Sequence, residues 1–318
     1  MIPAAVAALS ALSTLLLSPR AVPPRALDLG ARTTLADAPA GPEHVATGSP
    51  TCDCARFASE LADAHALYAS RGDGATRPAP AAARDRFRER LLLTYARARC
   101  LVDCGGVDER AHDDARALLA AAAFKSRHFG PTDATVEERL TRGLDETARC
   151  LAHAPAPPSC HLWHGSIRGI RARGSWNPTQ LGLPTQLLAE FRAARAGAPP
   201  GRDLPDGAAT RAEASLLLRA PGFAGGDPQA ARRLMEDATT SPLYACTVDN
   251  RLLFAETLAA TGASVRAVAE LRATVDAGLS TCGDNRYENV IDLDQAARCL
   301  ARLEARPDKD PGWDDDCR

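Results

Sequence analysis

The side chains that could do chemistry gather in one segment of the middle third of this sequence. Histidines, arginines, tryptophans and a cysteine occur together there: His153, Cys160, His161, Trp163, His164, Arg168, Arg171, Arg173 and Trp176. His161 and His164 are three residues apart and would share a face of a helix, so they could hold zinc or copper together with His153. No carboxylate is interleaved with them, which weakens the metal interpretation. The alternative is that Trp163 belongs to the core and the histidines are capping or surface groups.

The three arginines of this segment suggest a different ligand. A guanidinium group pairs well with carboxylate or phosphate, so Arg168, Arg171 and Arg173 beside Trp176 could bind an anionic head group. The alternative is an ordinary solvated helix end. Metal or small-anion binding at this segment is therefore the second of the functions that the sequence leaves open.

Motifs for nucleophilic catalysis and phosphate binding are absent. The sequence has no G-x-S-x-G motif, and the GGD segment at Gly225 lacks the glycine and lysine of a P-loop. The formal net charge is -2 and no block of basic residues occurs, which argues against nucleic acid as a partner. We therefore expect neither enzymatic activity nor a cofactor.

Ten cysteines form an even set, which is typical of an exported chain held by disulfides. They are Cys52, Cys54, Cys100, Cys104, Cys150, Cys160, Cys246, Cys282, Cys299 and Cys317. The first four form two pairs too close along the chain to constrain much if bonded internally, so we expect cross-links between the first two helices. Cys150 should bond to Cys160 across a proline-rich turn. The alternative is a cytosolic protein with reduced thiols.

The amino terminus has the length of a secretory signal. The apolar stretch Ile2–Leu17 is short for a membrane span, although no basic residue precedes it and no clear cleavage site follows. Residues 1–18 are predicted to be a signal peptide or an amino-terminal anchor, followed by a disordered Pro/Ala/Gly-rich tether at 19–50. A helical-repeat domain at 51–306 and a polar tail at 307–318 complete the chain. We expect export to the periplasm or cell envelope, or secretion, with no membrane span in the mature chain if the signal is cleaved.

Helical patterns alternate with short Gly, Pro or Asp turns from residue 52 onward, and no alternating strand pattern appears. The predicted fold is all-α, with about eleven helices at 55–70, 81–102, 108–124, 134–152, 159–174, 184–196, 206–219, 228–238, 243–260, 264–276 and 289–305. Asp206, Asp227 and Ser264 are predicted N-caps, and Pro228 suits the first turn of its helix.

Two of these helices repeat each other 36 residues apart. GGDPQAARRLMEDA and TGASVRAVAELRAT align so that Gly226, Ala231, Met235 and Ala238 fall on Gly262, Ala267, Leu271 and Thr274. A glycine turn followed by small and bulky residues at these intervals is typical of the second helix of a tetratricopeptide-type hairpin. The sequence therefore predicts a tetratricopeptide-like helical-repeat superhelix of antiparallel hairpins.

The order of elements resembles a known family, the tetratricopeptide-like T component of tripartite ATP-independent periplasmic (TRAP) transporters. The segments that carry the resemblance are LWHGSIRG, RAEASLLLRAPGF, GGDPQAARRLMEDATTSPLY and NRLLFAETLAATG, between Trp163 and Ala277. The resemblance implies an extracytoplasmic protein with a hydrophobic groove or pore that binds rather than catalyses. It also implies self-association and a partner that is an extracytoplasmic solute-binding protein.

The first expected function is therefore a non-enzymatic scaffold whose inner surface binds a partner protein or a hydrophobic ligand. Stacked hairpins offer an extended inner surface without reactive groups. Its lining should come from the first helix of each hairpin: Trp163, Ile167, Ile170, Leu217, Phe254 and Leu258. Core packing would explain the apolar members of this set equally well. A structural part of an envelope assembly, without a small-molecule ligand, is the third possibility.

Overall fold

Helices and short turns make up the whole described part of the chain. A computed structural model describes residues 51–72, 81–129, 134–172, 182–198, 204–241, 244–279 and 286–305. These residues belong to one unit, Gly48–Arg318. They contain no strand, so the all-α prediction is confirmed. The predicted signal or anchor at 1–18, the tether at 19–50 and the tail at 307–318 lie outside the described residues.

Eleven α-helices occur in the described ranges. They are α2 (Phe57–Ala69), α3 (Ala81–Val102), α4 (His112–Phe129), α5 (Ala134–Leu151), α6 (Pro158–Ala172), α7 (Leu183–Gly197), α8 (Ala208–Arg219), α9 (Pro228–Thr240), α10 (Val248–Ala260), α11 (Ser264–Ala277) and α12 (Arg286–Ala305). Short 3-10 turns are η1 (Cys54–Arg56), η2 (Ser70–Gly72), η4 (Pro205–Gly207) and η5 (Gly222–Ala224). The predicted bounds of α3 are correct, whereas α10 begins five residues later than the predicted 243.

One of the three predicted caps is present. Asp227 accepts a hydrogen bond from the backbone N–H of Ala230 at 2.9 Å, and Pro228 opens the helix. The prediction for Asp206 is wrong, because this residue lies in η4 at φ 65° and α8 begins after Gly207. The prediction for Ser264 is also wrong, because Ser264 is already the first helical residue.

The pattern of buried side chains follows the 36-residue repeat. The buried residues of α9 are Ala231, Met235 and Ala238, and those of α11 are their aligned counterparts Ala267, Leu271 and Thr274. A glycine with positive φ precedes each helix, but Gly225, at 93°, lies one position before the aligned counterpart of Gly262, at 81°. The two helices therefore repeat each other in packing as well as in sequence. The superhelix itself stays a prediction.

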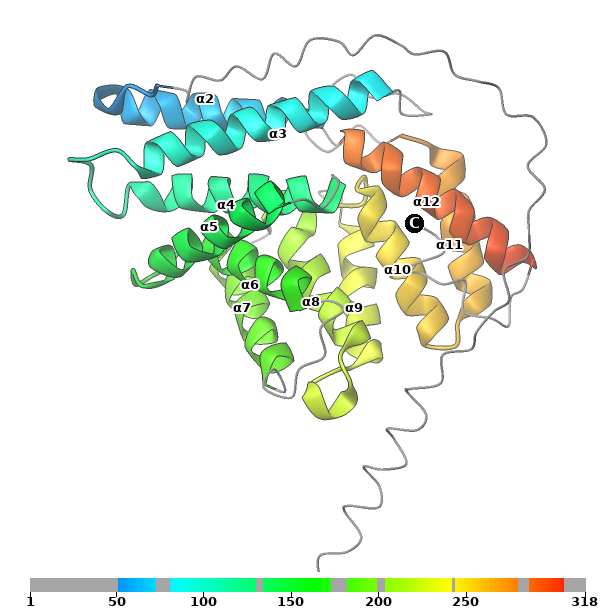
Figure 1. The fold of residues 1–318 in the computed structure, drawn as a ribbon. Coiled ribbons are helices and arrows are strands. Elements are labelled where there is room, and N and C mark those ends of the chain that lie inside the picture. Colours follow the sequence, from blue (N-terminus) through cyan, green and yellow to red (C-terminus); the bar gives the residue numbers. More distant parts are fainter. Residues whose placement is uncertain are drawn as a thin grey trace, which may run out of the picture. The chain divides into compact units, whose positions relative to one another are not determined.

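Each helix contacts the next along the chain, from α2 to α12 (Figure 1). The helix α10 also contacts α8 and α12, so it is enclosed by α8, α9, α11 and α12. Its side chains are buried on several faces, including Leu252, Phe254 and Leu258. They belong to the largest apolar cluster, which extends from Leu188 in α7 to Leu303 in α12. Because α10 is enclosed in this way, its buried apolar side chains cannot contact a partner.

The last helix packs against the first ones. The helix α12 contacts α3 and η2, and the rings of Phe87 in α3 and Tyr287 in α12 stack with centroids 4.5 Å apart. Ala122 of α4 and Val290 of α12 belong to the same buried cluster. A linear repeat array would place contacts only between neighbouring repeats. Here the two ends of the described chain are joined instead.

Three described disulfides agree with the predicted pairing. Cys52–Cys100 and Cys54–Cys104 join the segment before α2 to the end of α3, and Cys150–Cys160 joins α5 to α6 across the proline-rich turn. Cys246 and Cys299 are disulfide-bonded as well, and no described cysteine is a free thiol. Cys282 and Cys317 lie outside the described residues.

Candidate functional site

The three histidines of the sequence cluster have different environments. His153 follows α5, and its Nδ1 lies 3.0 Å from both carboxylate oxygens of Asp113 in α4. His164 in α6 has its Nδ1 2.8 Å from Oε2 of Glu190 in α7. His161 has a buried Nδ1 without a hydrogen-bond partner, and burial lowers the pKa of this imidazole. The carboxylates that the local sequence lacked are thus supplied by other helices.

The described arginines of the segment face carboxylates rather than an open anion site. Nη1 of Arg168 lies 2.9 Å from Oε1 of Glu190, and its Nη2 donates to Gln186 at 2.5 Å. Nε of Arg171 lies 4.0 Å from Oε2 of Glu137. Arg173 and Trp176 lie outside the described residues. Guanidinium groups that are already paired would have to exchange a carboxylate of the chain for an incoming anion.

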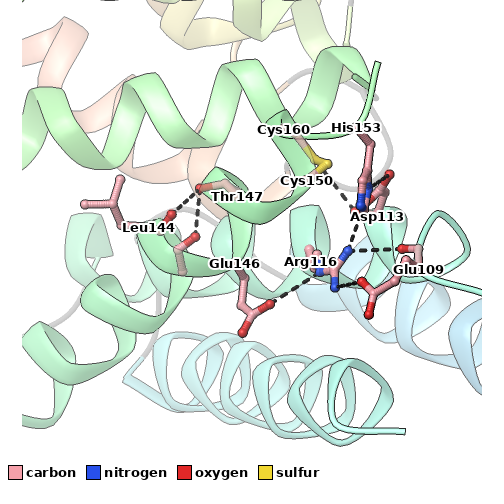
Figure 2. The surroundings of a disulfide bond; sticks show 10 residues. Glu109, Asp113, Arg116, Leu144, Glu146, Thr147, Cys150, His153 and Cys160 are labelled. Atoms are coloured by element: carbon pink, nitrogen blue, oxygen red, sulfur yellow. Dashed lines mark hydrogen bonds and ion pairs between the residues drawn. A yellow bond between two sulfur atoms is a disulfide. The ribbon is translucent and has the colours of Figure 1, made fainter. Parts of the chain in front are cut away.

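The Cys150–Cys160 disulfide lies beside a second group of charges, drawn in Figure 2. The Arg116 side chain is 5% exposed and lies 3.0 Å from Asp113, 2.5 Å from Glu109 and 3.4 Å from Glu146. The hydrogen bond from Arg116 lowers the pKa of Glu109 below its usual value. The group holds α4 to α5 and to the turn that precedes α4. We regard it as structural, because the buried guanidinium of Arg116 is paired with three carboxylates of the chain.

Potential metal ligands converge at one place in the described part of the chain. The sulfur atoms of Cys52, Cys54 and Cys104 lie within 4.8 Å of one another. These sulfurs belong to disulfides, and the metal ligand in proteins is the thiolate. His153, His161 and His164 do not form such a set with any described carboxylate or cysteine. The geometry therefore gives the histidine metal site no support.

A third buried ionic group surrounds Glu288 in α12. Oε1 of Glu288 lies 3.1 Å from Nη2 of Arg71 and 2.9 Å from Nζ of Lys125. Burial alone would raise the pKa of Glu288, but these two cations hold it below its usual value. One turn further, burial and the charge of Asp249 raise the pKa of Asp292 well above its ordinary value. Sequence reasoning missed this group, because its members come from η2, α4, α10 and α12.

Four of the six residues predicted to line an open groove belong to the core. Ile167, Leu217, Phe254 and Leu258 are at most 5% exposed and pack in apolar clusters. Trp163 and Ile170 are partly buried, and Trp163 packs against three of those clusters. The physical reason is enclosure, since neighbouring helices cover the faces of α6, α8 and α10 that these residues occupy. The six residues do not form one surface.

The apolar surface that a partner could reach lies elsewhere. Val265 in the first turn of α11 is 87% exposed, and Phe223 in η5 is 80% exposed. Beside Val265, a hollow of about 290 Å³ lies between α11 and the end of α12; it is lined by Ser264, Val265, Val268, Ala269, Arg272, Leu303 and Glu304. We call it the α11–α12 hollow. Its apolar lining and its rim, where Arg272 pairs with Glu304 at 2.5 Å, suit a protein side chain rather than a charged small molecule.

Comparisons with known proteins do not assign this chain to a family. Models of protein families give no match to the chain, and a search of curated proteins gives none either. None of the helices in the described ranges combines the length and apolar character that a membrane span requires.

Proposed function

We propose that this chain is a non-enzymatic, exported helical scaffold that binds a partner protein at the α11–α12 hollow. The observation that carries the proposal is the exposure of Val265 beside an apolar hollow, in a helix whose repeat counterpart is polar at the same position. The counterpart of Val265 in α9 is Gln229, 36 residues earlier. A valine that is 87% exposed contributes little to the core, and a partner that covered it would bury its apolar surface.

The chemistry of the described residues favours binding over catalysis. Neither His153 nor His164 hydrogen-bonds to a hydroxyl or a thiol; both contact carboxylates. All described cysteines are in disulfides, so none of them offers a thiolate nucleophile. Disulfides form and persist in oxidising compartments, which supports export to the periplasm, the cell envelope or the medium.

The partner we propose is an extracytoplasmic solute-binding protein, as in the TRAP transporter T components that the sequence resembles. The disulfide-stapled helical fold is compatible with such an accessory role. Self-association through the same hollow is the competing outcome of the test below. The histidine and arginine segment, the alternative site for a metal or an anion, receives less support because His153, His164 and Arg168 already pair with carboxylates of other helices.

The test compares two substitutions at equivalent positions of the repeat. Val265→Asp places a carboxylate at the α11–α12 hollow, while Gln229→Asp places one in the first turn of α9. Both carboxylates suit a helix amino terminus, so neither variant should unfold the protein. The full, oxidised chain carrying a tag is used to capture partners from the envelope of its native host.

We expect wild type and Gln229→Asp to capture a solute-binding protein in near-equal molar amount. Val265→Asp should lose about tenfold or more of the affinity, because burying a valine contributes about 1.5–3 kcal/mol. Equal capture by the two variants, or capture of the chain's own copies alone, would overturn the proposal.

A further inference from the structure

The two disulfides at the amino-terminal end of the helical unit lie side by side. Cys52–Cys100 and Cys54–Cys104 both join the segment before α2 to the end of α3. The sulfurs of Cys52 and Cys104, which belong to different disulfides, are only 3.8 Å apart. Thiol–disulfide exchange proceeds by attack of a thiolate on a disulfide sulfur, so its success depends on such proximity.

We propose that these four cysteines form one thiol-exchange site, which takes a dithiol as its substrate and moves the surviving disulfide from Cys52–Cys100 to Cys52–Cys104. Three features of the site favour this course of reaction. Cys54 is exposed to an incoming thiolate, and its partner Cys104 lies close to Cys52. A backbone N–H also donates to the sulfur of Cys100, the last leaving group.

The first step is attack on the exposed end of the site. Cys54 is exposed, whereas Cys104 is 6% exposed. A thiolate of the dithiol attacks Sγ of Cys54 and forms a mixed disulfide there. The Cys54–Cys104 bond breaks, and its electron pair stays on Sγ of Cys104 as a thiolate.

The second step passes the reduction to the neighbouring disulfide. The Cys104 thiolate attacks Sγ of Cys52, 3.8 Å away, and the Cys52–Cys100 bond breaks. The electron pair leaves on Sγ of Cys100. That sulfur already accepts a hydrogen bond from the backbone N–H of Cys52 at 3.1 Å, and a donor at this position stabilises the thiolate.

The last step releases the reductant. Its second thiol attacks the mixed disulfide, which frees Cys54 as a thiol and closes the reductant into its own disulfide. Two electrons have passed from the dithiol to the protein. The product holds one Cys52–Cys104 disulfide, with thiols at Cys54 and Cys100, and the segment before α2 is still bonded to the end of α3.

Loop closure does not oppose the exchange. The original disulfides close sequence separations of 48 and 50, and the new one closes 52. The entropy of closing a loop changes only with the logarithm of its length. Loop entropy alone therefore favours neither the exchanged nor the unexchanged product.

The test is partial reduction of the full oxidised chain with one molar equivalent of dithiothreitol at a pH of about 8, where thiols ionise in part. Acid then stops exchange, free thiols are alkylated, and peptide mass spectrometry locates the labels and the remaining disulfides. We expect a Cys52–Cys104 peptide and labels on Cys54 and Cys100. Cys150–Cys160 should stay intact, because both of its cysteines are fully buried.

Labels confined to Cys54 and Cys104, with no Cys52–Cys104 peptide, would overturn the proposal. The matched control is the double variant Cys52→Ala with Cys100→Ala, which removes the acceptor disulfide while Cys54–Cys104 still closes the loop. In that variant the same treatment should place both labels on Cys54 and Cys104. A label on any third cysteine there would also count against a local exchange.

Discussion

At the scale of single residues, Glu288 joins parts of the chain that are far apart in sequence. One of its carboxylate oxygens forms ion pairs with Arg71 from η2 and with Lys125 from α4. All three side chains are largely buried. Buried charges are tolerated only when they are paired, so each member of this group depends on the other two. Lys125 is one of only two lysines in the chain. Its position directly after the apolar run 117–124 of α4 was a sequence signal that could have pointed to the group.

Removing the charge of Glu288 should destabilise the fold strongly. Glu288→Gln leaves Arg71 and Lys125 buried without an anion, and we expect a loss of about 3–5 kcal/mol in the free energy of unfolding. The matched control is Glu304→Gln, which breaks the half-exposed pair with Arg272 and should cost at most about 1 kcal/mol. Urea unfolding of both variants measures the difference. Equal losses would show that the buried group is not a unit of stability.

The raised pKa of Asp292 predicts a dependence of stability on pH. The charged groups around Asp292 are Asp249 in α10, Lys125 in α4, Arg211 in α8 and Glu288 in α12. Because the folded state holds the proton of Asp292 more tightly than the unfolded state, the free energy of unfolding falls as pH rises from about 4 through the raised pKa.

Asp292→Asn removes this titration and should weaken the decline. Relative to wild type, the variant should therefore gain stability between pH 4 and pH 7, as measured by urea unfolding at both values. A variant that instead loses stability relative to wild type over this range would contradict the assignment.

At the scale of elements, the repeat positions allow a paired test. Met235 in α9 and Leu271 in α11 are fully buried at equivalent positions. Truncating either to alanine should cost about 2–5 kcal/mol, because a cavity remains in the core. Arg233→Ala on the exposed face of α9 should change stability by no more than about 0.5 kcal/mol. A large loss for one repeat position and a negligible one for the other would contradict their equivalence.

Local sequence predicted the helices well where local physics decides them. Asp227 and Pro228 mark the start of α9, because a cap and a first-turn proline act within a few residues. Asp206 did not cap α8: the chain adopts positive φ there, and the Asp206 carbonyl instead accepts hydrogen bonds from Arg211 and Asn250. Asn250 lies 44 residues away, so no local pattern could reveal it.

At the scale of the whole molecule, contacts between elements that are distant in sequence could not be predicted from the repeat. The Phe87–Tyr287 stack joins residues about two hundred positions apart, and repeat periodicity carries no information about such a contact. The enclosure of α10 likewise turned the expected groove residues Phe254 and Leu258 into core. The exposed Val265 could have been noticed from the repeat, because its counterpart Gln229 is polar.

The paired disulfides predict non-additive stability. Cys52–Cys100 and Cys54–Cys104 close almost the same loop, so replacing one pair with alanines should cost less than about 1 kcal/mol of loop entropy. Replacing both pairs should cost about 4 kcal/mol, and replacing Cys150 and Cys160 about 3 kcal/mol. Chemical denaturation of the four variants measures this. Additive losses from the two amino-terminal pairs would refute the shared-loop explanation.

The most direct test of partner binding at the α11–α12 hollow is site-specific photo-crosslinking in the native host. A photoreactive residue is placed at position 265 in one variant and at position 229 in the other. We predict that the chain labelled at 265 becomes cross-linked to an extracytoplasmic solute-binding protein, while the chain labelled at 229 does not. No cross-link to another protein from position 265, or the same product from both positions, would contradict the account.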